Sequence, residues 1–511
     1  MSTETSTATP VERDSEFVRA DPRELIVGAN VRLDPRLDKG FIASVRERGV
    51  LQAITAYRDD EQRLIVLYGQ RRTVAAVEVG LPTVPVMVVA RPDEVDRLGD
   101  QVIENDRRAA LTVGERVTAF EQMAAFGLSA AQIAKRTGNQ GKDDVATALT
   151  VAKSPLAKGA AQRYDFLDLQ QAAVVAEFAD DKDAVTRLIG AAKAGQGFGH
   201  LAQRLRDDRA EQQAKADKTA ELAAAGLAIV DQPEHADPKV RELYRLVDAD
   251  EQKLDEANHR ECPGHAAFVK RDWYRVEITD EAPEPEDDDH EDEEDAEGES
   301  GGRTREVFGW TPKFVCTDYT AHGHQERFRA TGTSGQPKVA EMTDQERETK
   351  RAERRDVIQS NKDWGSATTV RREWLATFLT RKTLPKGAAV FLAAGLARPD
   401  MDLARAYDLA YGLLKLDGKR PSWQYGQDAF TVLVGKATEA RAQVLALALV
   451  VAAFEFPLKE RNSWRGADAN TVRYLRFLQT CGYELAAIER RACGEPAPVA
   501  DQDTSDPDSQ D

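Results

Sequence analysis

An acidic segment near the middle of the chain constrains its architecture more than any other feature. Between Glu284 and Glu297, eleven residues are aspartate or glutamate. Such a segment has too little apolar content to offset the entropy of ordering it. A chain of 511 residues is also too long for one core. We therefore expect several units joined by linkers.

The net charge of −18 does not exclude nucleic-acid binding. One acidic tract supplies most of it, and phosphate contacts are local and screened beyond about 10 Å. The Ser/Thr-rich N-terminus lacks the apolar stretch of a signal peptide, and four scattered cysteines do not form a disulfide framework. The longest apolar run, 444–454, is too short to span a bilayer and predicts a buried helix. We expect a cytoplasmic protein without membrane contact.

Alternating signals in the first hundred residues predict a small α/β domain. Helices are expected at 38–48 and 71–79, ended by Gly49 and Gly80. Strands are expected at 24–27, 53–57, 63–68 and 84–89.

The turn between the third strand and the second helix reads Gly69-Gln70-Arg71-Arg72. Glycine allows a tight turn, and the amides at a helix N-terminus favour an anion. The two arginines add forked donors suited to phosphate. The motif predicts a phosphate cradle, with a surface-charged helix start as the alternative.

A second charged motif, Glu104-Asn105-Asp106-Arg107-Arg108, follows the last strand. A carboxylate beside an amide oxygen can hold Mg²⁺, which usually arrives with nucleotide phosphates. The arginines would neutralise phosphate charge. A solvated face is the alternative.

Residues 129–153 read as two short helices joined by a Gly-containing turn, which predicts a helix–turn–helix. Asp143 and Asp144 either read cytosine amino groups or cap the second helix. Any helical hairpin is the alternative. The candidate DNA contacts are Lys135, Arg136, Gln140, Lys142, Thr147 and Lys153.

In order and spacing, these motifs resemble the N-terminal half of ParB/Spo0J partition proteins, of plasmid or actinobacterial type, over roughly residues 20–210. The matching segments are Asn30-x-Arg32, Phe41 to Gln52, Gly69 to Arg72, Gly80 to Val86, Glu104-Asn105-x-x-Arg108 and the helix–turn–helix.

The resemblance implies a sequence-specific DNA-binding partition protein. Gln52 and its neighbours would approach the cytosine base, Gly69 to Arg72 with Arg108 would hold the triphosphate of CTP, and Glu104 with Asn105 would hold Mg²⁺. CTP would stabilise a homodimeric clamp on double-stranded DNA at the nucleoid, and a ParA-type ATPase would be its partner. Gln70 stands where the family usually has Glu, so CTP binding is expected and hydrolysis is left open.

A possible metal site lies outside the resemblance. Cys262 and His265 form one group, and Cys316 with His322 and His324 forms another. The pairs Cys262–His265 and Cys316–His322 would supply four soft ligands suited to tetrahedral Zn²⁺. The roughly 50-residue gap between the pairs would loop out through the acidic linker. Unliganded surface pairs are the alternative.

These features predict an α+β multidomain chain. A small mixed region, which carries the candidate zinc ligands, is expected on both sides of the linker. The expected boundaries are 1–19 disordered, 20–110 nucleotide-binding α/β domain, 111–210 all-α helix–turn–helix domain, 211–280 helix and mixed region, 281–303 acidic disordered linker, 304–340 remainder of the mixed region, 341–493 all-α C-terminal domain and 494–511 disordered tail.

Two other functions compete with partition. A transcriptional repressor of a plasmid or phage could use the same scaffold. An enzyme on this fold, a sulfiredoxin-like phosphotransferase or a nuclease, is disfavoured because no cysteine precedes Cys262 and no carboxylate cluster accompanies Glu104.

Overall fold

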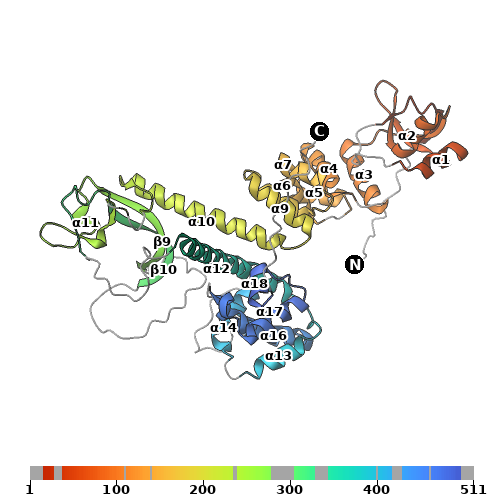
Figure 1. The fold of residues 1–511 in the computed structure, drawn as a ribbon. Helices are drawn as coiled ribbons and strands as arrows, with labels where there is room; N and C mark the ends of the chain where they lie inside the picture. The colour runs from red at the N-terminus through yellow and green to blue at the C-terminus, as the bar shows by residue number, and fades with distance from the viewer. Residues whose placement is uncertain are drawn as a thin grey trace, which may run out of the picture. The chain divides into compact units, whose positions relative to one another are not determined.

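The computed structural model divides into two compact units, Met1–Ala202 and Gln203–Asp511, which we take one at a time (Figure 1). It describes residues 15–27, 37–108, 111–138, 141–233, 237, 239–277, 304–327, 343–398, 401–416, 429–459 and 462–495. Asn30, Arg32, Gln140, the predicted acidic linker and the tail from residue 496 lie outside these ranges.

The first unit opens with a five-stranded mixed sheet in the order β1-β5-β3-β4-β2. Strands β3 and β5 run parallel, whereas β3 and β4 run antiparallel. Alternate residues of β5, Val84, Val86 and Val88, are buried, as the two-residue period of a strand requires. The elements are β1 (Ser15–Ala20), β2 (Ile26–Val27), α1 (Lys39–Arg48), β3 (Ile54–Arg58), β4 (Leu64–Tyr68), α2 (Gln70–Val79), β5 (Val84–Val89) and α3 (Glu94–Arg108).

The first strand corrects one boundary. The sequence predicts disorder over 1–19, but residues 15–20 form β1, which pairs antiparallel with β5 from Ser15 opposite Val89 to Ala20 opposite Val84. None of its residues is fully buried, and Phe17 is 70% exposed. It is held by its pairing with β5 and by Val18 and Ala20, which pack against the sheet core. With only these two small apolar contacts, its sequence gives a weak strand signal.

Helices complete the first unit and carry the predicted helix–turn–helix. Capping boxes at Thr112 and Ser129 start α4 and α5, as their sequences predict. The last helix begins in the first unit and runs unbroken past residue 210 in the second, because no Gly or Pro stands between residues 200 and 225 to end it. The helices are α4 (Val113–Ala125), α5 (Ala130–Arg136), α6 (Lys142–Lys153), α7 (Pro155–Arg163), α8 (Leu169–Glu177), α9 (Lys182–Ala194) and α10 (Phe198–Ala224).

The second unit contains a small β-rich module built on one long strand pair, β9 and β10 (Figure 1). The pair is antiparallel and runs from Glu277 opposite Thr304 to His265 opposite Cys316. The predicted acidic linker falls in sequence between the two strands. The elements are β6 (Ala228–Ile229), β7 (Arg241–Glu242), η1 (Leu243–Arg245), β8 (Leu246–Val247), α11 (Glu256–His259), β9 (His265–Glu277), β10 (Thr304–Cys316) and β11 (Gln325–Glu326).

A helical domain forms the rest of the second unit. Its first helix is continuous over Asp344–Phe378, whereas the sequence predicts a separate charged helix or spacer at 341–359. Glu211 of α10 joins this helix to the module through Lys362 at 2.7 Å and Arg271 of β9 at 3.0 Å. The elements are α12 (Asp344–Phe378), α13 (Ala388–Leu396), α14 (Leu403–Leu413), α15 (Ala429–Gly435), α16 (Glu439–Glu455), η3 (Phe456–Lys459), η4 (Ser463–Gly466), α17 (Ala469–Thr480) and α18 (Ala487–Ala492).

Helix α16 carries the longest apolar run. By length and composition alone, Glu439–Leu458 could cross a membrane, but more than half of that window is buried within the domain. Val444, Leu447 and Val451 belong to the main core. Such burial is typical of the central helix of a folded domain, as the sequence predicts.

Candidate functional site

The predicted phosphate cradle forms the turn from β4 into α2. Gly69 adopts φ 108°, a left-handed conformation that favours glycine, and it stands at the N-cap of α2. No side chain caps α2 at Gly69, so the positive end of the helix dipole is not compensated by a cap. Local structure at this turn therefore suits an anion.

Arg72 contacts the backbone of a neighbouring segment, which the sequence did not predict, while its contact with phosphate stays a prediction. Its Nη1 donates to the backbone oxygens of Gln52 at 2.7 Å and Ala53 at 2.8 Å. An added Cβ at Gly69 would lie 3.3 Å from the Arg72 guanidinium, so the turn and this side chain are closely packed. Arg72 thereby fastens the segment before β3, where Gln52 is exposed, beside the cradle.

Arg71 is the more accessible arginine. Its side chain is 42% exposed, its Nη2 lies 3.3 Å from Asp38 Oδ2, and its guanidinium lies 4.9 Å from the centre of the Phe41 ring. Asp38 also caps α1 by accepting from the Phe41 amide. The sequence analysis missed Asp38 as a partner because 33 residues separate it from Arg71.

Helix α3 carries the predicted magnesium ligands, Glu104 and Asn105, and Arg108. Their backbone is helical, and their side chains lie outside what the structure describes. Earlier in the same helix, Asp100 accepts from the Tyr68 hydroxyl at 3.4 Å. Tyr68 immediately precedes Gly69, so α3 is fastened to the strand that ends in the cradle.

The same helix contacts the helix–turn–helix. Asp96 lies 3.3 Å from Arg136 Nε. An added Cβ at Gly99 would stand 3.0 Å from the Arg136 carbonyl oxygen, which leaves no room for a larger residue without a shift. Helix α3 therefore connects the cradle to the end of α5.

Some of the predicted DNA-contacting side chains are exposed, and others bond to neighbouring protein groups. Lys135, Lys142 and Lys153 are exposed. Arg136 is paired with Asp96, and the Thr147 hydroxyl donates to the Asp143 carbonyl oxygen at 2.9 Å. The accessible lysines are those that could approach a phosphate backbone.

The two aspartates occupy the first turn of α6, behind Gly141. An added Cβ at Gly141 would lie 2.8 Å from an Asp144 carboxylate oxygen. Asp144 thus lies over the helix start, where a negative charge opposes the positive end of the helix dipole. This placement favours helix stabilisation over base reading for Asp144.

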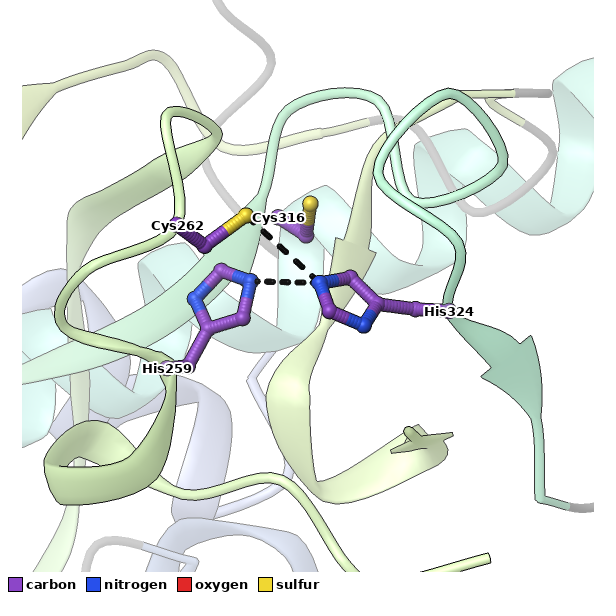
Figure 2. A group of neighbouring side chains, drawn as sticks. All are labelled: His259, Cys262, Cys316 and His324. Carbon is purple, nitrogen blue, oxygen red and sulfur yellow. Dashed lines mark hydrogen bonds between the residues drawn. The ribbon is translucent and has the colours of Figure 1, made fainter. Parts of the chain in front are cut away.

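Four possible metal ligands converge at one end of the β9–β10 pair (Figure 2). One ligand atom each from His259, Cys262, Cys316 and His324 lies within 4.8 Å of every other. His259 Nε2 is 3.2 Å from His324 Nε2, and Cys262 Sγ is 3.5 Å from the same nitrogen. His259 and Cys316 are buried.

The grouping keeps both predicted cysteines and replaces both predicted histidines. His265 turns its Nδ1 to His259 Nδ1 at 3.0 Å and stacks on Phe314, so it lies behind His259. His322 packs against Gly264 instead. His259 and His265 each lie three residues from Cys262, so spacing alone could not show which of the two histidines is the ligand.

Burial sets the protonation of this group. It lowers the pKa of His259 to about 4, and the neighbouring His324 and His265 add to the effect. Burial likewise raises the pKa of the Cys316 thiol to about 11, and the nearby Cys262 contributes in the same direction. Near pH 7, His259 is therefore neutral with a lone pair to offer, and the Cys316 thiol keeps its proton.

Comparison with known proteins bears on the first unit. A family model described as the ParB N-terminal domain matches residues 34–106. The probable chromosome-partitioning protein ParB of Treponema pallidum is 33% identical over 114 residues, 22% of this chain and 35% of that protein. The transcriptional repressor protein KorB of Escherichia coli is 30% identical over 131 residues, 25% of this chain and 36% of that protein. The chain therefore spans about a third of the length of these relatives.

One solved structure is the C-terminally truncated chromosome-partitioning protein ParB from Caulobacter crescentus complexed with CTP-gamma-S. It is 24% identical and covers 35% of this chain and 98% of its own, with a TM-score of 0.17. The family match extends from before α1 to α3 and includes the Gly69 turn. Residues 34–106 therefore match the ParB N-terminal domain, and this part of the chain is similar to chromosome-partitioning proteins.

Proposed function

We propose that this chain is a partition protein that binds a specific double-stranded DNA site and CTP with Mg²⁺. One observation carries the proposal: Arg72 joins the Gln52 segment to the Gly69 turn, and α3 joins that turn to the helix–turn–helix. A nucleotide bound at the cradle would thus contact elements that are bonded, through α3, to the helix–turn–helix.

The proposed roles divide along these contacts. Arg71 and the α2 amides hold phosphate oxygens, Arg72 positions Gln52 toward the base, and Glu104 and Asn105 with Arg108 complete the metal and phosphate site. DNA binding by the helix–turn–helix would favour self-association of two chains, and CTP would stabilise the resulting clamp. The partner that moves it would be a ParA-type ATPase at the nucleoid.

Chromatin immunoprecipitation with sequencing tests the proposal in the native host. We expect a peak that spreads well beyond the primary DNA site in the wild type. In Arg71→Ala, we expect the primary site alone. Spreading that persists in Arg71→Ala would overturn the assignment of the cradle.

A second function, transcriptional repression, is favoured by the similarity to KorB. The same profile separates the two. Occupancy confined to a promoter, with derepression of its gene in a deletion strain, supports repression. Spreading together with unstable inheritance of the replicon supports partition.

Gln70 bears on turnover. In Gln70→Glu, we expect an ionised oxygen to strengthen metal binding at the cradle, by on the order of tenfold if it adds about 1.4 kcal/mol. Mg²⁺-dependent CTP hydrolysis, measured as phosphate release, should rise with it. Gln70→Ala is the matched control, and equal rates in wild type and Gln70→Glu would contradict the idea that this position limits hydrolysis.

The exposed lysines of the helix–turn–helix should contribute through phosphate charge. For Lys142→Ala or Lys153→Ala, we expect weaker binding to all duplexes and a salt dependence, log K against log [salt], that is shallower by about 0.9 for each lost contact. Lys193→Ala, an exposed lysine on α9, is the control. Fluorescence anisotropy over a salt series measures both quantities. An unchanged slope would remove the lysine from the interface.

A further inference from the structure

We propose that the β-rich module binds one structural Zn²⁺ through His259, Cys262, Cys316 and His324. This site lies outside the ParB N-terminal domain and is independent of the proposed partition function. Three features of the module support this site: the spacing of the donor atoms, the backbone that holds them and the small core around them.

Two of the donor separations fit a tetrahedral ion. With Zn–N bonds of about 2.0–2.1 Å and Zn–S bonds of about 2.3 Å, a tetrahedron places two nitrogens about 3.4 Å apart and nitrogen and sulfur about 3.5 Å apart. The observed separations are 3.2 Å between His259 Nε2 and His324 Nε2, and 3.5 Å between Cys262 Sγ and His324 Nε2. Two thiols and two imidazoles are the donor set that favours zinc over Mg²⁺ or Ca²⁺.

The backbone brings the two halves of the site together. The register of β9 and β10 sets His265 opposite Cys316, so residues 54 positions apart in sequence, such as Cys262 and Cys316, meet at one end of the pair. The Thr317 amide donates to the Gly264 oxygen at 2.9 Å, and the His324 amide donates to the Tyr319 oxygen at 2.8 Å. The first bond joins the two loops that carry the ligands, and the second lies within the loop that carries His324.

Gly264 allows the close approach. An added Cβ there would stand 2.8 Å from Cys316 Sγ and 2.6 Å from His322 Cδ2, which is too close for any side chain without a shift. The loop between Cys262 and His265 therefore lies directly against the second half of the site.

His265 has a different role. Ligating histidines commonly donate their second N–H to a fixed partner, which sets the ring orientation. His259 Nδ1 faces His265 Nδ1 at 3.0 Å, so an N–H there leaves Nε2 directed at the other ligands. His265 is thus a positioning residue for His259.

Among the described residues, the buried apolar clusters of the module are small. The buried residues beside the site are Leu243, Leu246, Leu254 and Cys316, and a second cluster consists of Ala266, Phe268 and Val315. Cores of this size seldom stabilise a fold alone and are commonly supported by a metal or disulfides. Four protein ligands leave no open position, which is typical of a structural rather than a catalytic zinc site.

Metal analysis of the full-length protein, purified from zinc-supplemented cells, tests the proposal. We expect one zinc per chain in the wild type, in His322→Gln and in the control Cys481→Ser, whose cysteine lies in the helical domain. We expect loss of zinc in Cys262→Ser and His324→Gln. His265→Gln should retain zinc, with affinity lowered by about 10–100-fold.

A cobalt titration of the metal-free wild type guards against variants that fail to fold. Tetrahedral ligand-field bands together with thiolate-to-cobalt charge transfer are expected. Substoichiometric zinc in the wild type, or a cobalt spectrum without thiolate bands, would overturn the site. Retention of zinc in His324→Gln with loss in His322→Gln would overturn the ligand set.

Discussion

Replacing Arg371 by Met should lower the free energy of unfolding of the C-terminal helical domain by about 3–5 kcal/mol. Arg371 of α12 is fully buried, as are its two partners. It bonds Glu455 at 2.7 and 2.8 Å and Glu489 at 2.5 Å. Removing the guanidinium leaves two buried carboxylates without their main counter-charge.

Two neighbouring tyrosines hold the buried carboxylates in place, so the domain cannot reduce the free-energy cost by moving them. Tyr474 and Tyr483 donate their hydroxyls to the same carboxylates at 2.9 and 3.2 Å, so neither Glu can move to solvent without breaking a second bond. Burial alone would lower the pKa of Arg371, but the charges of Glu455 and Glu489 outweigh it and raise the pKa well above its usual value. The arginine stays charged wherever the protein is folded.

Guanidinium unfolding followed by tryptophan fluorescence measures the effect. Arg354→Met, at an exposed position of the same helix, is the matched control and should change the free energy of unfolding by less than about 0.5 kcal/mol. If Arg371→Met cost no more than the control, the buried network would not be a source of the domain's stability.

Arg71→Ala should strongly weaken CTP binding while leaving affinity for the specific DNA site unchanged. Arg71 is half-exposed beside the α2 N-terminus, so it can reach a phosphate, and it lies away from α5 and α6 in the chain. Losing a charged hydrogen bond costs about 1.5–3 kcal/mol of binding free energy, which lowers affinity by roughly 10–150-fold. Losing the positive charge of Arg71 beside the helix N-terminus weakens phosphate binding further.

Asp38→Asn supplies the opposite change. Asparagine can still cap α1, but it no longer competes with phosphate for Arg71. We expect tighter CTP binding in Asp38→Asn and no change in Arg63→Ala, an exposed arginine paired with Asp59 and Glu61 in the turn between β3 and β4. Isothermal titration calorimetry ranks the three variants, and equal affinities for Arg71→Ala and Arg63→Ala would contradict the assigned role.

Local signals made the first domain predictable. A strand, a glycine and two arginines before a helix follow one another in the sequence, and the structure forms β4, the Gly69 turn and α2 from them. The caps at Thr112 and Ser129 are equally local. Where a few neighbouring residues determine a conformation, the sequence reveals it directly.

Contacts between residues far apart in the sequence could not be predicted from it. Nothing local marks Arg72 as a partner of the Gln52 carbonyl, or Arg371 as a residue buried between Glu455 and Glu489. The ligand group likewise depends on the β9–β10 register, which brings together His259 and His324 in place of His265 and His322. Such choices are made by packing, and a single sequence does not record them.

The account depends most on the cradle between β4 and α2. Calorimetric titration of the full-length wild-type protein with each of the four nucleoside triphosphates, with and without Mg²⁺, tests it directly. We predict one CTP bound per chain, more tightly with Mg²⁺, and no comparable binding of ATP, GTP or UTP. Absence of CTP binding under both conditions would contradict the account and leave a DNA-binding protein without a nucleotide switch.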